Sequence, residues 1–339
     1  MNEQRREIVR LMGAAGAAGL AGLRIGPAHA EPLPETKRIR IALASPGSCW
    51  APQFIAQELL RAEGFANLQY VPATGKRPVY DAVAAGEIDM SMAFIAPFIV
   101  QADTSGQVVM LAGVHPGCIE LYGSARVRAV HDLKGKSVST TQEGGPAQAF
   151  IAAMLAHVGL DPRRDVKWVV QPDEEGIQHL AEGKVDAKIA APPRSFELRA
   201  RKIGHVLVNM TADRPWSQYF CCVLTGNRDF VDKHPVATKR ALRAILKSAD
   251  VCVSDPERSA RVLAGFPGIG GVKAPYETWL QTIREVPYAR WRDYDTEDTV
   301  RFYALRLQEA GLVKSNPQKI LAQATDLRFL NELKKELKA

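Results

Sequence analysis

The sequence predicts a protein of the α/β class, with two similar α/β lobes joined by two crossover strands and followed by a helical C-terminal tail. Three observations predict this fold. Short strand-like segments alternate with amphipathic helical segments along most of the chain. One set of these segments recurs about 95 residues after its first occurrence. A longer strand-like segment follows each set, where a chain passing between two lobes would run.

The composition agrees with this architecture. With 339 residues, the chain is long enough for two domains that each bury a core. Hydrophobic residues make up 46% and charged residues 24%, which excludes a disordered chain, a collagen-like repeat and a small disulfide scaffold. The formal net charge is +7. Because like charges do not form a long run, no nucleic-acid partner is predicted.

The first copy of the repeat begins with a segment whose apolar residues alternate at period two, as in a half-buried strand. Glycines end the helical segments, because glycine readily takes the left-handed conformation at a helix C-terminus. The expected elements are a strand at 38–44, a helix at 52–63 before Gly64, a strand at 68–71, a helix at 77–85 before Gly86 and a strand at 88–92.

The second copy has the same order of elements, and glycines again end its helical segments. The closest internal match pairs Ala84–Ala93 with Ala181–Ala190, which share A-x-G-x-(aliphatic)-D-x-x-(aliphatic)-A, and a proline soon follows each. The two copies agree in the order of their elements, in their spacing and in the glycines that end their helices. This agreement favours a duplicated lobe over chance. The expected elements are a strand at 136–140, a helix at 146–158 before Gly159, a strand at 166–170, a helix at 174–182 before Gly183 and a strand at 185–190.

Two extended segments are expected to connect the lobes and to act as a hinge. Residues 108–122 leave the first lobe, and residues 217–224 return from the second. We therefore assign 31–118 and 221–339 to lobe 1 and 119–220 to lobe 2. The tail is expected to pack back on lobe 1, with helices at 236–253, 276–285, 296–310, 317–324 and 327–337.

Residues 1–30 have the pattern of an export signal peptide and are excluded from the fold. Arginines precede an uncharged stretch, 11–23, that is too short for a bilayer span, which needs about 20 apolar residues. Arg5-Arg6 begins a twin-arginine-like pattern, and the general secretory route is the alternative. Because Ala28-His29-Ala30 is an A-x-A site, we expect cleavage after Ala30 and a periplasmic protein.

The five cysteines are Cys49, Cys118, Cys221, Cys222 and Cys252, and an odd number leaves at least one thiol unpaired. Successive side chains of a strand point to opposite faces, so Cys221 and Cys222 are not expected to face the same side. No C-x-x-C occurs, and no set of histidines and cysteines has zinc spacing. Buried apolar packing is the favoured role of these thiols, and no metal site is predicted.

A ligand site is expected beyond the carboxyl ends of the parallel strands, where helix N-termini point. The corresponding loops are 45–50 and 140–145, and each leads into a helix whose first N–H groups can bind a carboxylate or sulfonate. Nearby aromatic side chains would supply apolar walls. The candidate ligand-binding residues are Ser48, Cys49, Trp50, Phe94, Thr141, Gln142, Gly144, Gly145, Trp216 and Tyr219.

Each candidate also has a purely structural interpretation. Ser48 and Thr141 could be helix N-caps, and Gly144 with Gly145 could only let the chain turn. The aromatic residues could belong to the core. Trp216 is the sharpest case, because its position beside the return crossover favours the ligand cleft, whereas its residue type favours burial.

Enzyme signatures are mostly missing from the sequence. Gly135-Lys136-Ser137 resembles the end of a P-loop, but position 130 is Val where the motif requires Gly. G-x-S-x-G is absent, and no paired carboxylates stand at the expected loop ends. The sequence therefore predicts no catalytic residues, no cofactor and no enzymatic activity.

Together these features resemble a solute-binding protein of an ABC importer. The chain is more closely similar to the nitrate/sulfonate/taurine (NitT/TauT) group, which also holds binding proteins for thiamine pyrimidine precursors. The resemblance runs from about Lys37 to Ala339. It is carried by Gly86-Glu-Ile-Asp89, Asp132-Leu-Lys-Gly-Lys136, Gly159-Leu-Asp-Pro162, Ala181-Glu-Gly-Lys-Val-Asp186 and residues 213–222.

This resemblance implies a type II periplasmic-binding-protein fold that closes like a clamshell on a small-molecule ligand. It also implies delivery of that ligand to an ABC permease in the inner membrane. Aromatic walls and facing helix N-termini favour an organic anion or a heteroaromatic ligand. We expect the protein to be a monomer.

Two other functions stay open: an enzyme on the same fold, and a sensor or adaptor. The family includes the pyrimidine synthase of thiamine biosynthesis, but its C-C-C-F-C motif is represented here only by Cys221-Cys222 followed by Val223. A dihydroxyphthalate decarboxylase is also similar in fold, although an export signal would be odd for it. The other function is that of a periplasmic sensor or adaptor that presents its ligand-bound form to a receptor.

Overall fold

The computed structural model describes residues 31–43, 48–72, 79–266 and 274–337. The predicted export signal at 1–30 and residues 45–47 of the first expected ligand loop lie outside the described residues. The chain divides into Met1–Leu33 and Pro34–Ala339, and every helix and strand below belongs to the second unit. Among the described residues, no helix is both long and apolar enough to cross a membrane.

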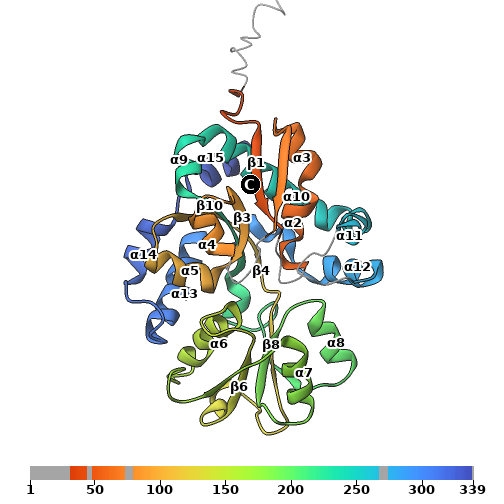
Figure 1. Cartoon of the computed structure of the whole chain (residues 1–339), viewed down its shortest axis with the longest axis vertical. Coiled ribbons are helices and arrows are strands. Elements are labelled where there is room, and N and C mark those ends of the chain that lie inside the picture. Colours follow the sequence, from red (N-terminus) through yellow and green to blue (C-terminus); the bar gives the residue numbers. More distant parts are fainter. Residues whose placement is uncertain (1–30, 44–47, 73–78, 267–273, 338–339) are drawn as a thin grey trace, which may run out of the picture. The chain divides into compact units, whose positions relative to one another are not determined.

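In the described part of the chain, two five-stranded sheets form the framework and are built alike (Figure 1). Their strand orders are β2-β1-β3-β10-β4 and β7-β6-β8-β5-β9. The first three strands of each are parallel, and the fourth is antiparallel to both its neighbours. The strands are β1 (Arg38–Ala42), β2 (Asn67–Val71), β3 (Met90–Phe94), β4 (Val108–Pro116) and β10 (Phe220–Asn227) in lobe 1, and β5 (Glu120–Gly123), β6 (Ser137–Thr140), β7 (Lys167–Val170), β8 (Ala187–Ala190) and β9 (His205–Asn209) in lobe 2.

The two crossovers are formed by the extended segments that the sequence indicates. β4 and β5 follow one another in the chain yet belong to different sheets, and β10 returns to the first sheet between β3 and β4. Gly117 lies in the first passage with a φ of +41°, and a Cβ there would come within 2.4 Å of the backbone of Thr211. Only glycine fits this close approach of the chain to itself.

Helices account for most of the remaining described chain. Before the second sheet they are α2 (Ala51–Ile55), α3 (Gln57–Ala62), α4 (Val79–Ala84) and α5 (Ile95–Thr104); within lobe 2 they are α6 (Pro146–His157), α7 (Asp173–Ala181) and α8 (Arg194–Ala200). After β10 come α9 (Arg228–Lys233), α10 (Pro235–Ser254), α11 (Pro256–Gly265), α12 (Tyr276–Glu285), α13 (Thr296–Glu309), α14 (Pro317–Ala324) and α15 (Arg328–Glu336). Short 3-10 turns are η1 (Ser48–Trp50), η2 (Val130–Leu133), η3 (Trp216–Gln218) and η5 (Tyr288–Arg292).

Three elements of the two lobes are not anticipated by the sequence pattern: α5, α8 and β9. Helix α5 starts at Ile95, directly after the last residue of β3, so no turn residue separates strand from helix. Strand β9 is at the edge of its sheet, and both His205 and Val206 are exposed, so apolar residues do not alternate there. Without a turn residue or an alternating apolar pattern, a sequence segment does not indicate where a helix or strand lies.

The aspartate of the repeated motif ties its strand into the sheet in both lobes. Asp89 accepts a hydrogen bond from the backbone N–H of Arg40 at 2.7 Å and pairs with the guanidinium of that residue. Asp186 accepts from the backbone N–H of Ser137 at 3.0 Å and from the guanidinium of Arg126 at 2.8 Å. The same carboxylate thus joins the third strand to the first strand in each lobe.

The C-terminal helices pack on both lobes, whereas the sequence indicates packing on lobe 1. Helix α10 packs against α2 and α3, while α13 packs against α5 and also against α6 of lobe 2. At the α6–α13 contact, the rings of Phe150 and Tyr303 lie 6.0 Å apart and those of His157 and Phe302 lie 6.4 Å apart. The tail therefore adds a third connection between the lobes.

Candidate functional site

A cavity of about 480 Å³ lies at the carboxyl ends of β6 and β8, beside the N-terminus of α6. This is where an open parallel sheet places its ligands. Thr140 ends β6, Ala190 ends β8, and Pro146 is the first residue of α6; all three line the cavity. Phe94, at the end of β3, is its contribution from the sheet of lobe 1.

One wall of the cavity is aromatic and rigid. Phe94 and Phe150 both line it, and their rings meet edge to face with centroids 5.5 Å apart. Trp50 packs edge-on against Phe94 with centroids 5.9 Å apart. Ile119 and Ile189 extend the apolar surface. A flat or apolar part of a ligand would meet side chains already fixed by their neighbours.

Charged side chains also line the cavity. They are the cations Lys188 and Arg194 and the carboxylate of Asp173, which both cations contact. Lys188 is buried, and its Nζ lies 2.5 Å from Oδ1 of Asp173. The Arg194 guanidinium lies 3.5 Å from Asp173 and 2.5 Å from Glu174. Burial alone would lower the pKa of Arg194, but the nearby carboxylates, including that of Glu197, raise it. An anion entering the cavity could share Lys188 with Asp173 or replace that carboxylate.

The second expected ligand loop contributes one of its predicted residues to the cavity. Thr141 lines it, as does Ala147 in the first turn of α6. Gln142 and Gly144 are exposed, and Gly145 is the N-cap residue of α6. The side chain of Ser48, from the first loop, lies outside the described residues.

The other predicted ligand residues lie elsewhere. Trp216 is 3% exposed and packs between the rings of His157 and Phe302, at 5.5 and 5.4 Å. Tyr219 stacks on Phe302 with centroids 4.0 Å apart. Trp50 is buried behind Phe94, and Cys49 is fully buried. None of these four is among the described residues that line the cavity. The structural interpretation of Trp216 therefore fits its surroundings, because a tail helix supplies the contacts.

Sequence reasoning did not identify the charged residues of the cavity. Lys188 stands in the repeated motif where the first copy has Ser91, and a lysine within a buried strand is the signal that could have found it. Asp173 begins α7 and Arg194 begins α8. Charged residues at helix starts are common, so these two carry no comparable signal.

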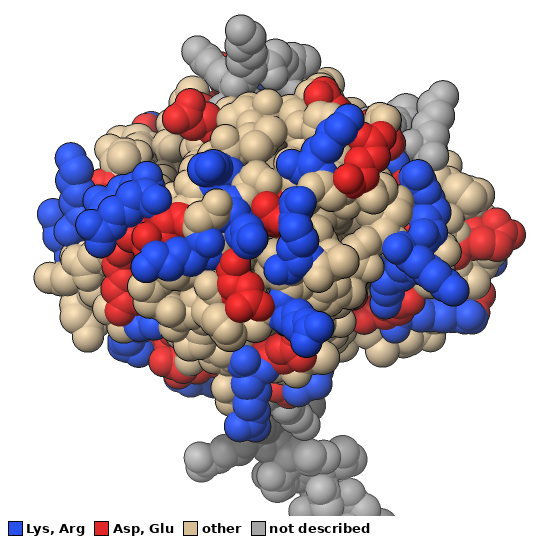
Figure 2. Space-filling model, turned by 90° about the horizontal axis from the view of Figure 1, so that it is seen from below, with Lys and Arg blue, Asp and Glu red and all other residues tan. Residues whose placement is uncertain are grey.

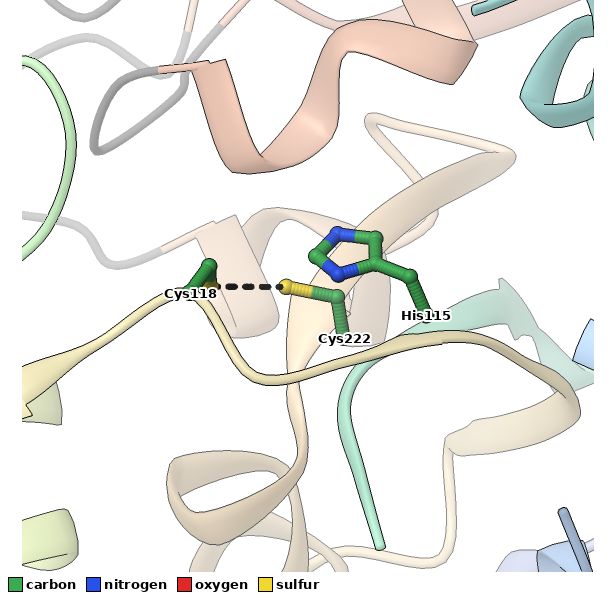
Figure 3. Close-up of side chains that lie close together, drawn as sticks. All are labelled: His115, Cys118 and Cys222. Atoms are coloured by element: carbon green, nitrogen blue, oxygen red, sulfur yellow. Dashed lines mark hydrogen bonds between the residues drawn. The ribbon is translucent and has the colours of Figure 1, made fainter. Parts of the chain in front are cut away.

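A second polar cluster lies in the core, away from the cavity lining, and is built from thiols. Cys49, Cys118, Cys221 and Cys222 are all buried. Figure 3 shows Cys118 and Cys222 with His115, and one ring nitrogen of His115 and the two sulfurs lie within 4.8 Å of one another. Cys118 Sγ lies 3.4 Å from Cys221 Sγ and 3.9 Å from Cys222 Sγ, so both adjacent cysteines of β10 contact one thiol. The register between β10 and β4 shifts at these residues, and such irregularities change the alternation of side chains along a strand.

The fold and the cavity define the class of protein. Two α/β lobes of like topology, two crossover strands and a helical tail form a type II periplasmic-binding-protein fold. The chain belongs to the NMT1-like family, whose model matches residues 33–265. The expected membership of the nitrate/sulfonate/taurine type of binding proteins is thereby confirmed.

Individual relatives match part of the chain. The nitrate/nitrite binding protein NrtA of Synechococcus elongatus is 25% identical over 180 residues, which cover 51% of this chain and 40% of that protein. The 4-amino-5-hydroxymethyl-2-methylpyrimidine phosphate synthase THI12 of Saccharomyces cerevisiae is 23% identical over 231 residues, covering 63% and 66%. The crystal structure of the periplasmic nitrate-binding protein NrtA from Synechocystis PCC 6803 has a TM-score of 0.70 at 15% identity and covers 90% of each chain, a likeness of fold.

Proposed function

We propose that the chain is a periplasmic solute-binding protein of an ABC importer that closes on a small organic ligand with an anionic or heteroaromatic part. The cavity at the ends of β6 and β8 carries this proposal, because it joins an aromatic wall to a buried cation. The named nitrate-binding relatives support it. The protein delivers its ligand to a permease of the inner membrane and acts as a monomer.

The proposed binding mode follows from the two walls. The apolar part of the ligand contacts Phe94 and Phe150, and its anionic group lies between Lys188 and the N-terminus of α6, whose dipole favours negative charge. Asp173 then turns toward Arg194 or solvent. Ligand contacts from both lobes stabilise a closed arrangement, and the crossovers act as the hinge.

The decisive experiment is to identify the ligand and then to remove the buried cation. Protein recovered from the periplasm is denatured, and the released small molecule is identified by mass spectrometry. Calorimetry with that molecule should show a roughly 10- to 100-fold loss of affinity for Lys188→Met, which keeps the chain length but removes the charge.

Lys167→Met is the matched control, because Lys167 lies exposed on β7 of the same lobe. It should leave the affinity unchanged. Equal affinities for wild type and Lys188→Met, with both proteins folded, would show that the cavity charge does not bind the ligand.

Export of the protein to the periplasm is also part of this proposal. N-terminal sequencing of the periplasmic form should begin at Glu31, and Arg5→Lys with Arg6→Lys should retain the protein in the cytoplasm. No nucleic-acid partner is proposed. On the face seen in Figure 2, Lys and Arg side chains are interleaved with Asp and Glu instead of forming one basic patch.

An enzyme on the same fold is the second candidate, because the match to the pyrimidine phosphate synthase covers 63% of the chain. The two functions differ in one measurement. A binding protein returns its ligand chemically unchanged after incubation and release, whereas an enzyme yields a product of different mass. Detection of such a product would favour the second candidate over the first.

A further inference from the structure

Two cysteines stand at the base of lobe 2, one on each crossover. Cys118 lies between β4 and β5 on the outgoing segment, and Cys221 is the second residue of β10 on the return. They therefore flank the segment 119–220 that was assigned to lobe 2. Both are buried free thiols in this structure, and their sulfurs lie 3.4 Å apart although the residues are 103 positions apart in the chain.

We propose that Cys118 and Cys221 form a disulfide in the exported protein, so that lobe 2 becomes a covalently closed loop. This proposal rests on the export proposed above, because the periplasm is oxidising whereas the cytoplasm keeps thiols reduced. An S–S bond is about 2.0 Å long, so the two sulfurs have to approach by about 1.4 Å. Rotation of either side chain about χ1 moves its sulfur through a distance of that order.

The backbone at Cys221 is irregular and gives this residue room to move. On β10, Phe220 pairs with Pro116 and Cys222 pairs with His115, and these two partners are consecutive residues of β4. Cys221 is therefore the extra residue of a β-bulge, where the ladder is locally interrupted. A residue without a partner in the ladder can reorient its side chain without breaking the pairing of the strands.

The other pairings of these cysteines are less favourable. The sulfur of Cys222 is farther from that of Cys118, at 3.9 Å, and Cys222 is paired with β3 on one side and with β4 on the other. A bond between Cys221 and Cys222 would join neighbours whose Cα atoms lie about 3.8 Å apart, below the roughly 4.4–6.8 Å of ordinary disulfides. Of the five cysteines, three should therefore stay thiols.

Cys118 is the member of the pair that an oxidant reaches first. It lines a cavity of about 120 Å³, together with the polar residues Glu120, Arg199 and Glu285. Cys221 is fully buried and is not among the described residues of that cavity. An oxidant therefore reacts at Cys118, and Cys221 completes the bond from inside the protein.

The electrostatics of the pair suit this order. Burial, and then the hydrogen bond with Cys221, raise the pKa of Cys118. Burial also opposes ionisation of Cys221, but the hydrogen bond from the Cys118 thiol lowers the pKa of Cys221 below its ordinary value. The shared proton thus lies on Cys118 and the negative charge on Cys221, and a thiolate is the form that attacks a disulfide.

The oxidant is a disulfide, either of a protein or of a small molecule. Cys118 Sγ attacks one oxidant sulfur while its proton passes to Cys221, and the other oxidant sulfur leaves as a thiolate. Cys221 then gives up its proton and attacks Cys118 Sγ, which expels the first oxidant sulfur. Relative to two thiols, the protein has lost two electrons and two protons, and the disulfide of the oxidant has become two thiols.

The first test uses the purified protein with all five cysteines reduced. The protein is incubated with excess oxidised glutathione, the remaining thiols are alkylated in denaturant, and the peptides are analysed by mass spectrometry. We expect a pair of peptides linked through Cys118 and Cys221, with the other cysteines alkylated. The melting temperature should rise by about 5 °C or more, because the bond closes a loop of about 100 residues.

Three variants separate the proposed pair from the other cysteines. Cys118→Ser should lose both the linked peptides and the rise in melting temperature. Cys222→Ser should keep both, and so should Cys252→Ser, the control variant in α10. Melting temperatures of the reduced proteins establish that each variant is folded.

The second test uses protein recovered from the periplasm and alkylated before any oxidant is added. The Cys118–Cys221 link should already be present. A periplasmic protein with both cysteines reduced overturns the proposal, and so does a wild-type link between Cys118 and Cys222. A glutathione adduct that persists on Cys118 also overturns it, because Cys221 then fails to attack. Protein found only in the cytoplasm would overturn the proposed export instead, while the glutathione experiment still decides whether the two sulfurs bond.

Discussion

The two lobes share one topology, yet they divide the chemistry of the molecule unequally. Lobe 2 supplies Lys188, Asp173 and Arg194 to the ligand cavity, whereas the sheet of lobe 1 contributes Phe94. Among the buried cysteines, by contrast, Cys221 and Cys222 belong to β10 of the lobe 1 sheet. Duplication of a lobe therefore repeats the strands and helices, whereas the residues at individual positions, and so the charges they supply, can differ between the copies.

The repeated positions are those that the backbone requires. Gly86 and Gly183 have φ values of +69° and +68°, and each follows a helix in the left-handed conformation that favours glycine. Asp89 and Asp186 each bind the backbone of the first strand of their sheet. These residues fix strand positions in the same way in both lobes.

Other positions of the repeat hold different residues in the two lobes. Ser91 of lobe 1 donates its hydroxyl hydrogen bond to the carbonyl of Met92, and its own carbonyl accepts from Thr225 on β10. Lys188 occupies the matching position of lobe 2 and lines the cavity. A serine satisfied within its own sheet and a lysine at a cavity can thus occupy equivalent places in the repeat.

Truncating the tryptophan between the lobes should have the largest effect on stability. Trp216→Ala removes a buried ring packed against Phe302 of the tail, so the free energy of unfolding should fall by about 3–5 kcal/mol. Chemical denaturation measures this loss. Ligand affinity of the folded fraction should be preserved, because Trp216 is not among the described cavity residues. Weaker binding with an unchanged melting temperature would instead return Trp216 to the ligand site.

The two motif aspartates should differ in importance. Asp89→Ala should lower the free energy of unfolding by about 2–3 kcal/mol and Asp186→Ala by about 1–2 kcal/mol. The reason is the partner: the Arg40 side chain is 24% exposed, whereas the Arg126 side chain is 53% exposed and more strongly screened by water. Denaturation of both variants tests the order, and an equal or reversed loss would contradict it.

The smallest effect concerns pH at the α6–α13 contact. Burial lowers the pKa of His157, and the nearby Arg306 lowers it further. The unfolded chain therefore takes up this proton first as pH falls. The contribution of His157 to stability is complete above its ordinary pKa of about 6.5 and declines below it. His157→Asn should flatten this part of the stability–pH curve.

His205→Asn is the control for that measurement, because His205 is exposed on β9 of the same lobe. It should leave the slope of the stability–pH curve unchanged. If both variants keep the wild-type slope, the α6–α13 contact is not the source of the pH dependence.

Much of the framework can be predicted from the sequence, because period-two strands and glycine helix ends are local signals. The cavity position also follows from the strand ends. The identity of its charged residues does not, since Lys188 is separated from its partner Asp173 by α7. Trp216 shows the same limit: its environment is completed by Phe302, which lies far along the chain. The contacts of Cys118 with Cys221 and Cys222 occur where the register of β10 shifts, which no local pattern indicates.

The insertion of lobe 2 between β4 and β10 also determines how the molecule would bear mechanical force. The described chain begins and ends in lobe 1, with β1 in its sheet and α15 packed on β4 and α10. A pull on the two ends would therefore load lobe 1 first, and it would reach lobe 2 through the α6–α13 contact. The chain ends of lobe 2 are shielded as long as β4 and β10 stay paired, because those strands hold both of them. Stretching should rupture the lobes in a fixed order, lobe 1 first and lobe 2 second.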